Sequence, residues 1–256
     1  QATAVAAAWH LLYLAAKILD DVEDEDADGT LWSTIGSSQA INAATGFIFA
    51  SQLALARLPQ MGANERLTLS ICQDFSRACL RMCAGQHADL TERSELCLER
   101  YFEVVAAKSG EFFALACRAG ALLGGGNAGQ VASYSEFGYN LGVLIQVWDD
   151  FEGIWNPQGK SDLATGKRTL PIIYALSVAP SAVQKQLMEF LSRAADEPQA
   201  EGEARRIITD LGAPQYVMTE AQIRRQRAER ALLRAGKSCP AHQQLIGLLN
   251  RVMPAL

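Results

Sequence analysis

Two short acidic segments hold the residues best suited to chemistry. The first, Asp20-Asp21-Val22-Glu23-Asp24, follows a long apolar stretch, and the second, Asp149-Asp150-Phe151-Glu152, follows another. If the first segment ends a helix, Asp20 and Asp24 lie one turn apart on the same face, and their carboxylates repel each other. They also lie at the helix C-terminus, where negative charge is unfavourable. A bound divalent cation would remove both repulsions, and Mg²⁺ prefers such oxygen ligands.

The first segment alone is explained equally well by an acidic helix end in contact with solvent. The second segment changes this balance, because two apolar helices that both end in acidic pairs could point them into one cavity mouth. Facing carboxylate clusters of this kind can hold more than one Mg²⁺ ion against a diphosphate. The predicted metal ligands are Asp20, Asp21, Asp24, Asp149 and Asp150.

Lysines near these segments suit a diphosphate group. Lys108 interrupts an otherwise apolar helical stretch, where an unpaired ammonium group would be costly. Lys160 and Lys167 lie in the irregular stretch 154–169, which follows the second acidic segment. Metal ions and lysines around an apolar interior indicate a substrate with a hydrocarbon tail and a diphosphate head.

Helices are the elements that must position these residues. No segment alternates between apolar and polar residues as a half-buried strand does, whereas long stretches follow the helical period. Several of these stretches are apolar around most of the helix, so other helices must surround them. We therefore predict an all-α protein in which residues 1–256 form a single domain. The predicted helices span 2–26, 37–58, 64–90, 95–123, 128–154, 170–178, 181–195, 200–211, 213–236 and 240–253, with Ser37, Asn64 and Ser181 as N-caps.

Charge and composition exclude several classes of function. The net charge of −5 argues against a nucleic-acid partner. The acid is local, since seven carboxylates lie within residues 20–28 and the rest of the chain carries a net +2. Residues 2–19 are rich in alanine and contain His10 and Lys17, which fits neither a transmembrane segment nor a signal peptide. We expect a cytoplasmic protein. Because Gln1 already lies in a helical pattern, we also expect that native N-terminal residues are missing.

The chain resembles the trans-prenyl diphosphate synthases, also called the polyprenyl synthetase family, in several segments that follow one another in that family's order. Residues 20–24 resemble the first aspartate-rich motif, and Gln146-Val147-Trp148-Asp149-Asp150 resembles the second with its preceding glutamine. Between them, Gly85-Gln86-His87-Ala88-Asp89-Leu90 resembles the Gly-Gln-x-x-Asp-Leu segment, and Lys108-Ser109 stands where the family has Lys-Thr. Residues 159–163 and 166–171 resemble the closing lysine loop.

The resemblance implies a fold, a reaction and roles for single residues. The fold is an isoprenoid synthase helical bundle around a central apolar cavity, usually a homodimer. Asp20 and Asp24 would hold two Mg²⁺ ions, and Asp149, with Asp150, a third. The allylic diphosphate would be bound, and its departure assisted, by Lys108, Gln146, Lys160 and Lys167. Isopentenyl diphosphate would then attack the allylic cation and lose a proton, which gives a polyprenyl diphosphate.

Four departures from the family pattern affect the choice of acceptor. The second motif has Gly153 in place of its last aspartate, and the Arg-Arg-Gly that follows the first motif is replaced by a segment that includes Glu25 and Asp26. Tyr13 stands where a histidine or glutamine is usual, and the upstream basic segment is absent from Gln1 onward. Three of these four weaken the site for isopentenyl diphosphate rather than the ionising site.

Alternatives to chain elongation therefore stay open. The sequence around residues 18–44 and 85–91 is similar to the prenyltransferases that modify a tryptophan of bacterial pheromone peptides. A class I terpene cyclase, a degenerate partner subunit and a non-enzymatic helical scaffold are further alternatives.

The length of the product depends on side chains before the first acidic motif. The resemblance implies that bulky residues four and five positions before the motif act as a floor for the growing chain. Here these positions are Ala15 and Ala16, with Leu12 one turn deeper and Trp9 beyond it. The small side chains predict a product of twenty carbons or more, limited at Trp9.

Overall fold

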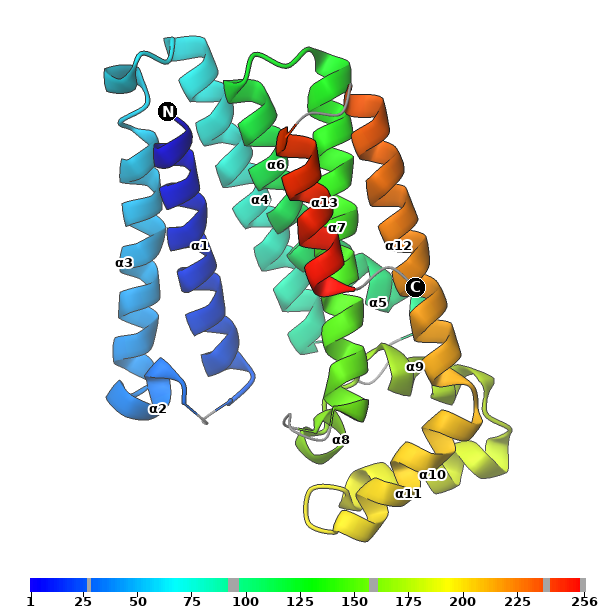
Figure 1. Cartoon of the computed structure of the whole chain (residues 1–256). Coiled ribbons are helices and arrows are strands. Elements are labelled where there is room, and N and C mark those ends of the chain that lie inside the picture. Colours follow the sequence, from blue (N-terminus) through cyan, green and yellow to red (C-terminus); the bar gives the residue numbers. More distant parts are fainter. Residues whose placement is uncertain (27–28, 92–96, 157–160, 237–239, 254–256) are drawn as a thin grey trace. The chain divides into compact units, whose positions relative to one another are not determined.

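The structure is a computed structural model that describes residues 1–26, 29–91, 97–156, 161–236 and 240–253 (Figure 1). Every element in these residues is a helix. This confirms the predicted all-α fold. The elements are α1 (Ala2–Glu23), α2 (Leu31–Ile35), α3 (Ser37–Leu55), the 3₁₀ turn η1 (Pro59–Met61), α4 (Glu65–Thr91), α5 (Leu98–Val105), the π-helical turn η2 (Ala106–Gly110), α6 (Glu111–Leu123), α7 (Ala128–Trp155), α8 (Asp162–Thr165), α9 (Leu170–Val178), α10 (Ser181–Arg193), α11 (Pro198–Asp210), α12 (Ala213–Ala235) and α13 (Pro240–Val252).

Helix starts follow the local chemistry of the residues before them. Asn64 is an N-cap as predicted, because its side-chain oxygen accepts a hydrogen bond from the backbone N–H of Leu67 at 2.8 Å. The predicted caps Ser37 and Ser181 are wrong. Gly36, with φ of +88°, and Pro180, with an extended backbone, occupy the N-cap positions, and each serine is the first helical residue.

The helix predicted over 95–123 is interrupted. α5, η2 and α6 follow one another along the chain, and the π-helical turn from Ala106 to Gly110 separates the two α-helices. π-helical turns are rare and occur often at functional sites. The apolar pattern of the sequence does not predict this turn, because the residues on both sides of the extra residue are apolar in either kind of helix.

The chain divides into two compact units, which are described separately. One contains Gln1–Leu80 and Leu115–Ser135, and the other contains Arg81–Ala114 and Glu136–Leu256. The prediction that residues 1–256 form a single domain stays a prediction.

In the first unit, α1 packs along α3 (Figure 1). Both helices bury alanines, among them Ala8 and Ala15 of α1 and Ala40 and Ala44 of α3, all at most 1% exposed. Small side chains allow two helix backbones to approach closely, and burial of these faces fixes the rotation of α1 about its axis. The rotation of α1 decides where the first acidic motif points.

In the second unit, an apolar cluster surrounds the C-terminal end of α7. Ile154 of α7 packs with Leu163, Ile172, Leu187 and Ile208, which come from α8, α9, α10 and α11. All five side chains are at most 2% exposed. Since they come from five successive elements, the cluster packs these elements together and holds the second acidic motif close to the segment that contains Lys167.

Among the described residues, α1 is the one helix that is long and apolar enough to cross a membrane by length and composition. A core helix of a soluble protein and an N-terminal signal sequence meet the same criterion, so this is weak evidence. The expected absence of a transmembrane segment stays a prediction.

Candidate functional site

The first acidic motif lies at the C-terminal end of α1. Asp20 and Asp24 are both half-buried, and the backbone N–H of Asp24 donates to the carbonyl of Asp20 at 2.8 Å. Asp21 is buried and forms an ion pair with Lys17 one turn earlier. Asp21 therefore already has a cationic partner within α1. Its role as a metal ligand stays a prediction, as do those of Asp20 and Asp24.

The four residues predicted to limit product length lie on two faces of α1. Leu12 and Ala15 are buried, at 5% and 1% exposed, on the side of the helix that also buries Ala8. Trp9 and Ala16 are half-buried, and they precede Asp20 by eleven and four residues. These spacings place Trp9 and Ala16 on the face of α1 that carries Asp20.

Asp150 is the most enclosed carboxylate of the second motif. It is 3% exposed and accepts three hydrogen bonds, from Tyr101 Oη at 2.6 Å, from the backbone N–H of Leu170 at 2.8 Å and from Gln146 Nε2 at 3.0 Å. Leu170 is the first residue of α9, so Asp150 places a negative charge at a helix N-terminus, where it is favourable. Through this contact α7 is joined to the end of the lysine loop.

Burial is the main reason that the pKa values of Asp149 and Asp150 are raised. Burial is the main cause of the raised pKa of Asp150, although its hydrogen bonds from Leu170, Tyr101 and Gln146 act in the opposite direction. Asp149 lies at the surface, but the surrounding protein and then the charges of Asp150 and Glu152 raise its pKa to about 6. Burial, followed by the charge of Asp150, raises the pKa of the Tyr101 hydroxyl well above its usual range. A cation bound beside these carboxylates would favour their charged forms.

Lys108 lies in the π-helical turn and forms an ion pair with Asp89 of α4, with Nζ 2.8 Å from Oδ2. Both side chains are partly exposed, at 26% and 35%. Gly85 permits this approach, because a Cβ atom at position 85 would lie 2.8 Å from the Cβ of Ala107. The ion pair explains how an ammonium group is tolerated within an apolar stretch.

Hydrogen bonds connect the π-helical turn to the second motif. Ser109 Oγ donates to Gln146 Oε1 at 3.1 Å, and Gln146 Nε2 donates to Asp150 Oδ1. Gly142 lies where α7 meets this turn, and a Cβ atom there would be 2.2 Å from the carbonyl oxygen of Ser109. Ser109, Gln146 and Asp150 are therefore held in one polar network, and Lys108 precedes Ser109 in the same turn.

The loss of the last aspartate of the second motif has a local explanation. A Cβ atom at Gly153 would lie 2.0 Å from Oδ2 of Asp162, so the Asp162 carboxylate occupies the space that a side chain at position 153 would need. Lys167 follows in the same segment, and its backbone N–H donates to the carbonyl of Asp162 at 3.1 Å. The predicted site residue Lys160 lies outside the described residues.

Three residues near this network were not among the predicted site residues. Asp89 and Gln86 belong to the Gly-Gln-x-x-Asp-Leu segment, so the motif itself was a usable signal for them. Both polar side-chain atoms of Gln86 are shielded from solvent and have no hydrogen-bond partner among the described residues. Such an unsatisfied group is typical of a side chain that binds a ligand. Tyr101 carried no sequence signal, because a tyrosine in an amphipathic helix is most often a core residue.

The two acidic motifs belong to different units of the chain. Within the ranges that the structure describes, no three histidine, cysteine or acidic side chains come together as a metal site. A joint site for several Mg²⁺ ions, and the central apolar cavity, therefore stay predictions.

Comparison with known proteins decides the family. The model of the family described as polyprenyl synthetase matches residues 1–211. The chain belongs to the polyprenyl synthetase family. A short chain isoprenyl diphosphate synthase of Methanothermobacter thermautotrophicus is 31% identical over 233 residues, which cover 84% of this chain and 68% of that protein. The geranylgeranyl pyrophosphate synthetase of Pyrococcus horikoshii has the same fold, with a TM-score of 0.90 at 22% identity over 99% of this chain and 79% of that one.

A second kind of relative within this similarity is a tryptophan prenyltransferase. The protein of that description from Bacillus spizizenii, ComQ, is 30% identical over 164 residues, which cover 64% of this chain and 55% of that protein. The comparisons confirm the predicted polyprenyl synthetase family, the isoprenoid synthase fold and the class of enzyme. The chain spans little more than half the length of some of these relatives.

Proposed function

We propose that this member of the polyprenyl synthetase family is a Mg²⁺-dependent trans-prenyltransferase that elongates an allylic diphosphate with isopentenyl diphosphate. The C–O bond to the diphosphate breaks and an allylic cation forms. The double bond of isopentenyl diphosphate then forms a new C–C bond to that cation, and the adduct loses a proton to give the longer diphosphate. The product has twenty carbons or more.

One observation carries this proposal: the polar network that runs from the π-helical turn to the start of α9. Lys108 is held by Asp89, and Ser109 connects the same turn to Gln146 and Asp150. Asp150 in turn holds the N–H of Leu170, three residues after Lys167. The network thus fixes two elements that each carry a lysine predicted to bind diphosphate, which favours charge stabilisation of a departing diphosphate.

The acidic residues fit a hard divalent cation. The donor set consists of carboxylate oxygens, and burial, followed by the charges of Asp150 and Glu152, raises the pKa of Asp149. Asp20 and Asp24 would hold two ions, and Asp149 a third. Bound Mg²⁺ would neutralise the charge that develops on the diphosphate. Asp150, already engaged by three donors, acts as a positioning residue for Gln146 and α9.

The protein's own side chains have distinct roles in this reaction. Lys108 and Lys167, together with Lys160, bind the diphosphate, and Gln146 orients it. The half-buried face of α1 with Ala16 and Trp9 lies beside the prenyl chain and limits its length. No side chain attacks the substrate, because the enzyme only stabilises the allylic cation and the diphosphate as they separate in a site that excludes water.

The test is an incubation with Mg²⁺ and C10, C15 or C20 allylic diphosphates, with and without isopentenyl diphosphate. We expect elongation only when both substrates and the metal are present. Lys108→Ala and Asp149→Asn are expected to lower kcat/KM at least about a hundredfold. The surface variants Lys185→Ala and Asp196→Asn remove the same charges on exposed parts of the chain and should keep full activity. Diphosphate release without elongation would contradict the choice of acceptor.

A second acceptor class is favoured by the acidic segment after α1. Glu25 and Asp26 stand where arginines would grip isopentenyl diphosphate, and the carbonyl of Asp26 accepts a hydrogen bond from Trp32 Nε1 at 2.8 Å. These residues repel a second diphosphate, so a tryptophan-containing peptide is the alternative acceptor. A class I terpene cyclase, which needs no second substrate, is the other alternative. Incubation with a tryptophan peptide and without isopentenyl diphosphate distinguishes the peptide transferase from both other reactions.

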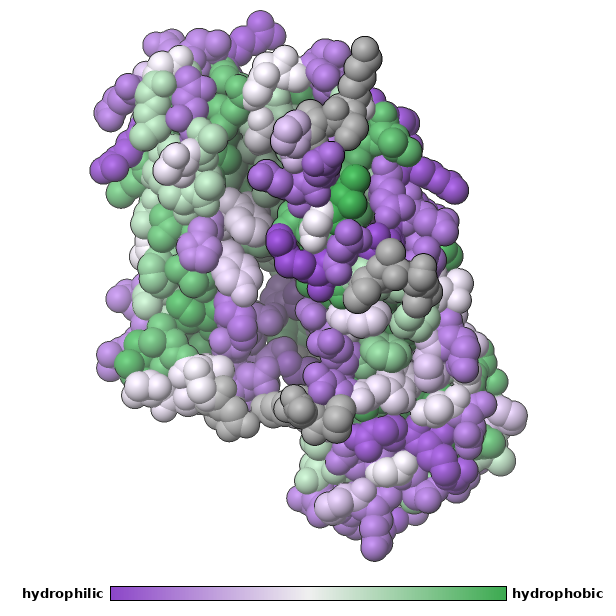
Figure 2. Space-filling view, viewed as in Figure 1, coloured by the Kyte–Doolittle hydropathy of each residue, from purple (hydrophilic) through white to green (hydrophobic). Residues whose placement is uncertain are grey.

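We propose a cytoplasmic homodimer as the working form. Figure 2 shows hydrophobic side chains along the surface over α3, where Ile41, Phe49 and Leu53 are 44%, 65% and 69% exposed. An apolar face of this kind is typical of a surface that associates. Light scattering after size-exclusion chromatography should give twice the chain mass, and Phe49→Ser should shift the equilibrium to the monomer.

A further inference from the structure

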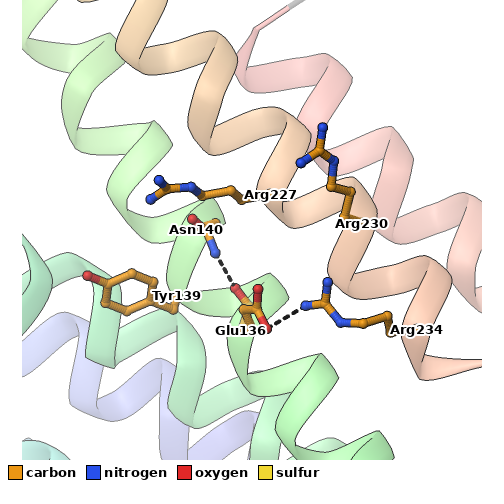
Figure 3. A pocket seen from close by; sticks show the side chains of 6 residues that line it. All are labelled: Glu136, Tyr139, Asn140, Arg227, Arg230 and Arg234. Carbon is orange, nitrogen blue, oxygen red and sulfur yellow. Dashed lines mark hydrogen bonds and ion pairs between the residues drawn. The ribbon is translucent and has the colours of Figure 1, made fainter.

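A surface pocket between α7 and α12 lies outside the predicted reaction site and within one unit of the chain. It is a surface depression with a volume of about 400 Å³ that is largely open to solvent. Glu136, Tyr139 and Asn140 come from the first half of α7, at spacings that place them on one face. Arg227, Arg230 and Arg234 come from one face of α12 and complete the lining (Figure 3).

The pocket has more positive than negative charge. Arg234 points to Glu136 and pairs with it at 2.5 Å, whereas the guanidinium groups of Arg227 and Arg230 point away from this carboxylate (Figure 3). Neither Arg227 nor Arg230 forms an ion pair or hydrogen bond with any residue in the ranges that the structure describes. Two like charges one turn apart repel each other, and an anion between them would remove this cost.

Asn140 gives an independent sign of a ligand. It is 3% exposed and lines the pocket, and its Nδ2 donates to the carbonyl of Glu136 at 2.9 Å. Its Oδ1 has no hydrogen-bond partner among the described residues. A buried polar atom without a partner is rare and costly, so a hydrogen-bond donor supplied by a ligand would stabilise it.

We propose that this pocket binds a small phosphorylated molecule that also carries a hydroxyl or amino donor. Arg227 and Arg230 hold the phosphate, since guanidinium groups match the geometry of phosphate oxygens. The hydroxyl or amino group of the ligand donates to Asn140 Oδ1. Glu136 keeps Arg234 in place at the edge of the pocket.

The test measures binding to the whole chain by isothermal titration calorimetry, in low salt with a chelator so that no metal ion is present. The probes are glycerol 3-phosphate, which has both a phosphate and hydroxyl donors, and methyl phosphate, which has the phosphate alone. We expect Arg227→Gln/Arg230→Gln to bind glycerol 3-phosphate at least about tenfold more weakly than the unmodified chain. Arg57→Gln/Arg66→Gln, with the same loss of charge at exposed positions of the other unit, should bind as the unmodified chain does.

The two probes test the role of Asn140 without a variant of this buried residue. The unmodified chain should bind glycerol 3-phosphate at least about threefold more tightly than methyl phosphate. Equal affinities for the two probes would overturn the donor requirement. The site itself would be overturned if the pocket variant and the control variant bound glycerol 3-phosphate equally. It would also be overturned if no binding were seen at 10 mM probe, which is roughly the weakest affinity expected for two guanidinium contacts.

Discussion

The carboxylate of Asp150, near the end of α7, accepts a hydrogen bond of 2.8 Å from the backbone N–H of Leu170, the first residue of α9. The two residues are twenty positions apart, and the lysine loop lies between them. A buried carboxylate thus fixes both the end of this loop and the start of a helix. The contact makes the second acidic motif a structural element as well as a candidate metal site.

Replacing Asp150 should lower the stability of the fold. In Asp150→Asn the amide oxygen can replace Oδ2, which accepts from Tyr101 and Leu170, but the new amide nitrogen then faces Gln146 Nε2, so at least one of the three hydrogen bonds is lost. Removal of a buried charge offsets part of the loss, and we expect the free energy of unfolding to fall by about 1–2 kcal/mol. Urea unfolding measures this change. Tyr101→Phe removes one donor only and should cost less; an Asp150→Asn protein as stable as the unmodified one would contradict the assigned role.

Replacing Asp149 should have the opposite effect in the metal-free protein. Its pKa of about 6 lies above the ordinary value of 3.8, so the fold disfavours the charged form. The cost is complete above pH 6 and absent when the group is protonated in both states, below about pH 4. Because Asp149 lies at the surface, solvent screening reduces the effect, and Asp149→Asn should gain on the order of 1 kcal/mol at pH 8. Urea unfolding with a chelator, at pH 8 and at pH 3.5, measures it.

Asp196→Asn is the matched control for this pH dependence. Asp196 is exposed in the turn between α10 and α11, so its replacement should change the free energy of unfolding equally little at both pH values. A stabilisation by Asp149→Asn that is larger at pH 3.5 than at pH 8 would reverse the expected sign and refute the prediction.

Two adjacent alanines should respond differently to the same substitution. Ala16 lies on the half-buried face of α1 that carries Asp20, so Ala16→Phe should shorten the prenyl product and leave the fold intact. Ala15 is 1% exposed on the other side of the helix, so Ala15→Phe should cost about 1–3 kcal/mol of stability through overpacking. Chromatography of the dephosphorylated products and thermal unfolding give the two readouts. An unchanged product from Ala16→Phe would place the floor elsewhere.

Gly153 and Gly202 form a further matched pair, since both lie within helices. A methyl group at position 153 would meet the Asp162 carboxylate at 2.0 Å, whereas nothing lies within 4 Å of a Cβ at position 202. Gly153→Ala should displace Asp162 and lower both stability and activity. Gly202→Ala should raise the free energy of unfolding by about 0.5–1 kcal/mol, because alanine favours the helix. Equal effects of the two variants in chemical unfolding would rule out the close contact.

The sequence was sufficient for the helices and for the family, because apolar periodicity and motif order are local properties. It predicted the ends of α4, α9 and α13 within about two residues. It could not predict which faces of α1 are buried, since Ala15 and Ala16 are identical in sequence terms and differ only in what packs against them.

Partners of single side chains were equally beyond the sequence. The spacing of Asp20 and Asp24 is visible in the chain, but the pairing of Lys108 with Asp89 depends on how α4 meets the π-helical turn. The same holds for Gly153, which looked like a lost ligand. Its reason is the Asp162 carboxylate of α8, which lies where a side chain at position 153 would be.

The π-helical turn at Ala106–Gly110 affects which insertions and deletions the chain can accept. A turn of this kind holds one residue more than an α-helical turn, and each residue corresponds to about 100° of rotation. Deletion of a single residue here would restore a continuous helix from Leu98 to Leu123 and rotate its first half about its own axis. A single-residue insertion or deletion in the middle of this segment should therefore disturb the protein more than one at its ends, because it would change whether Lys108 meets Asp89.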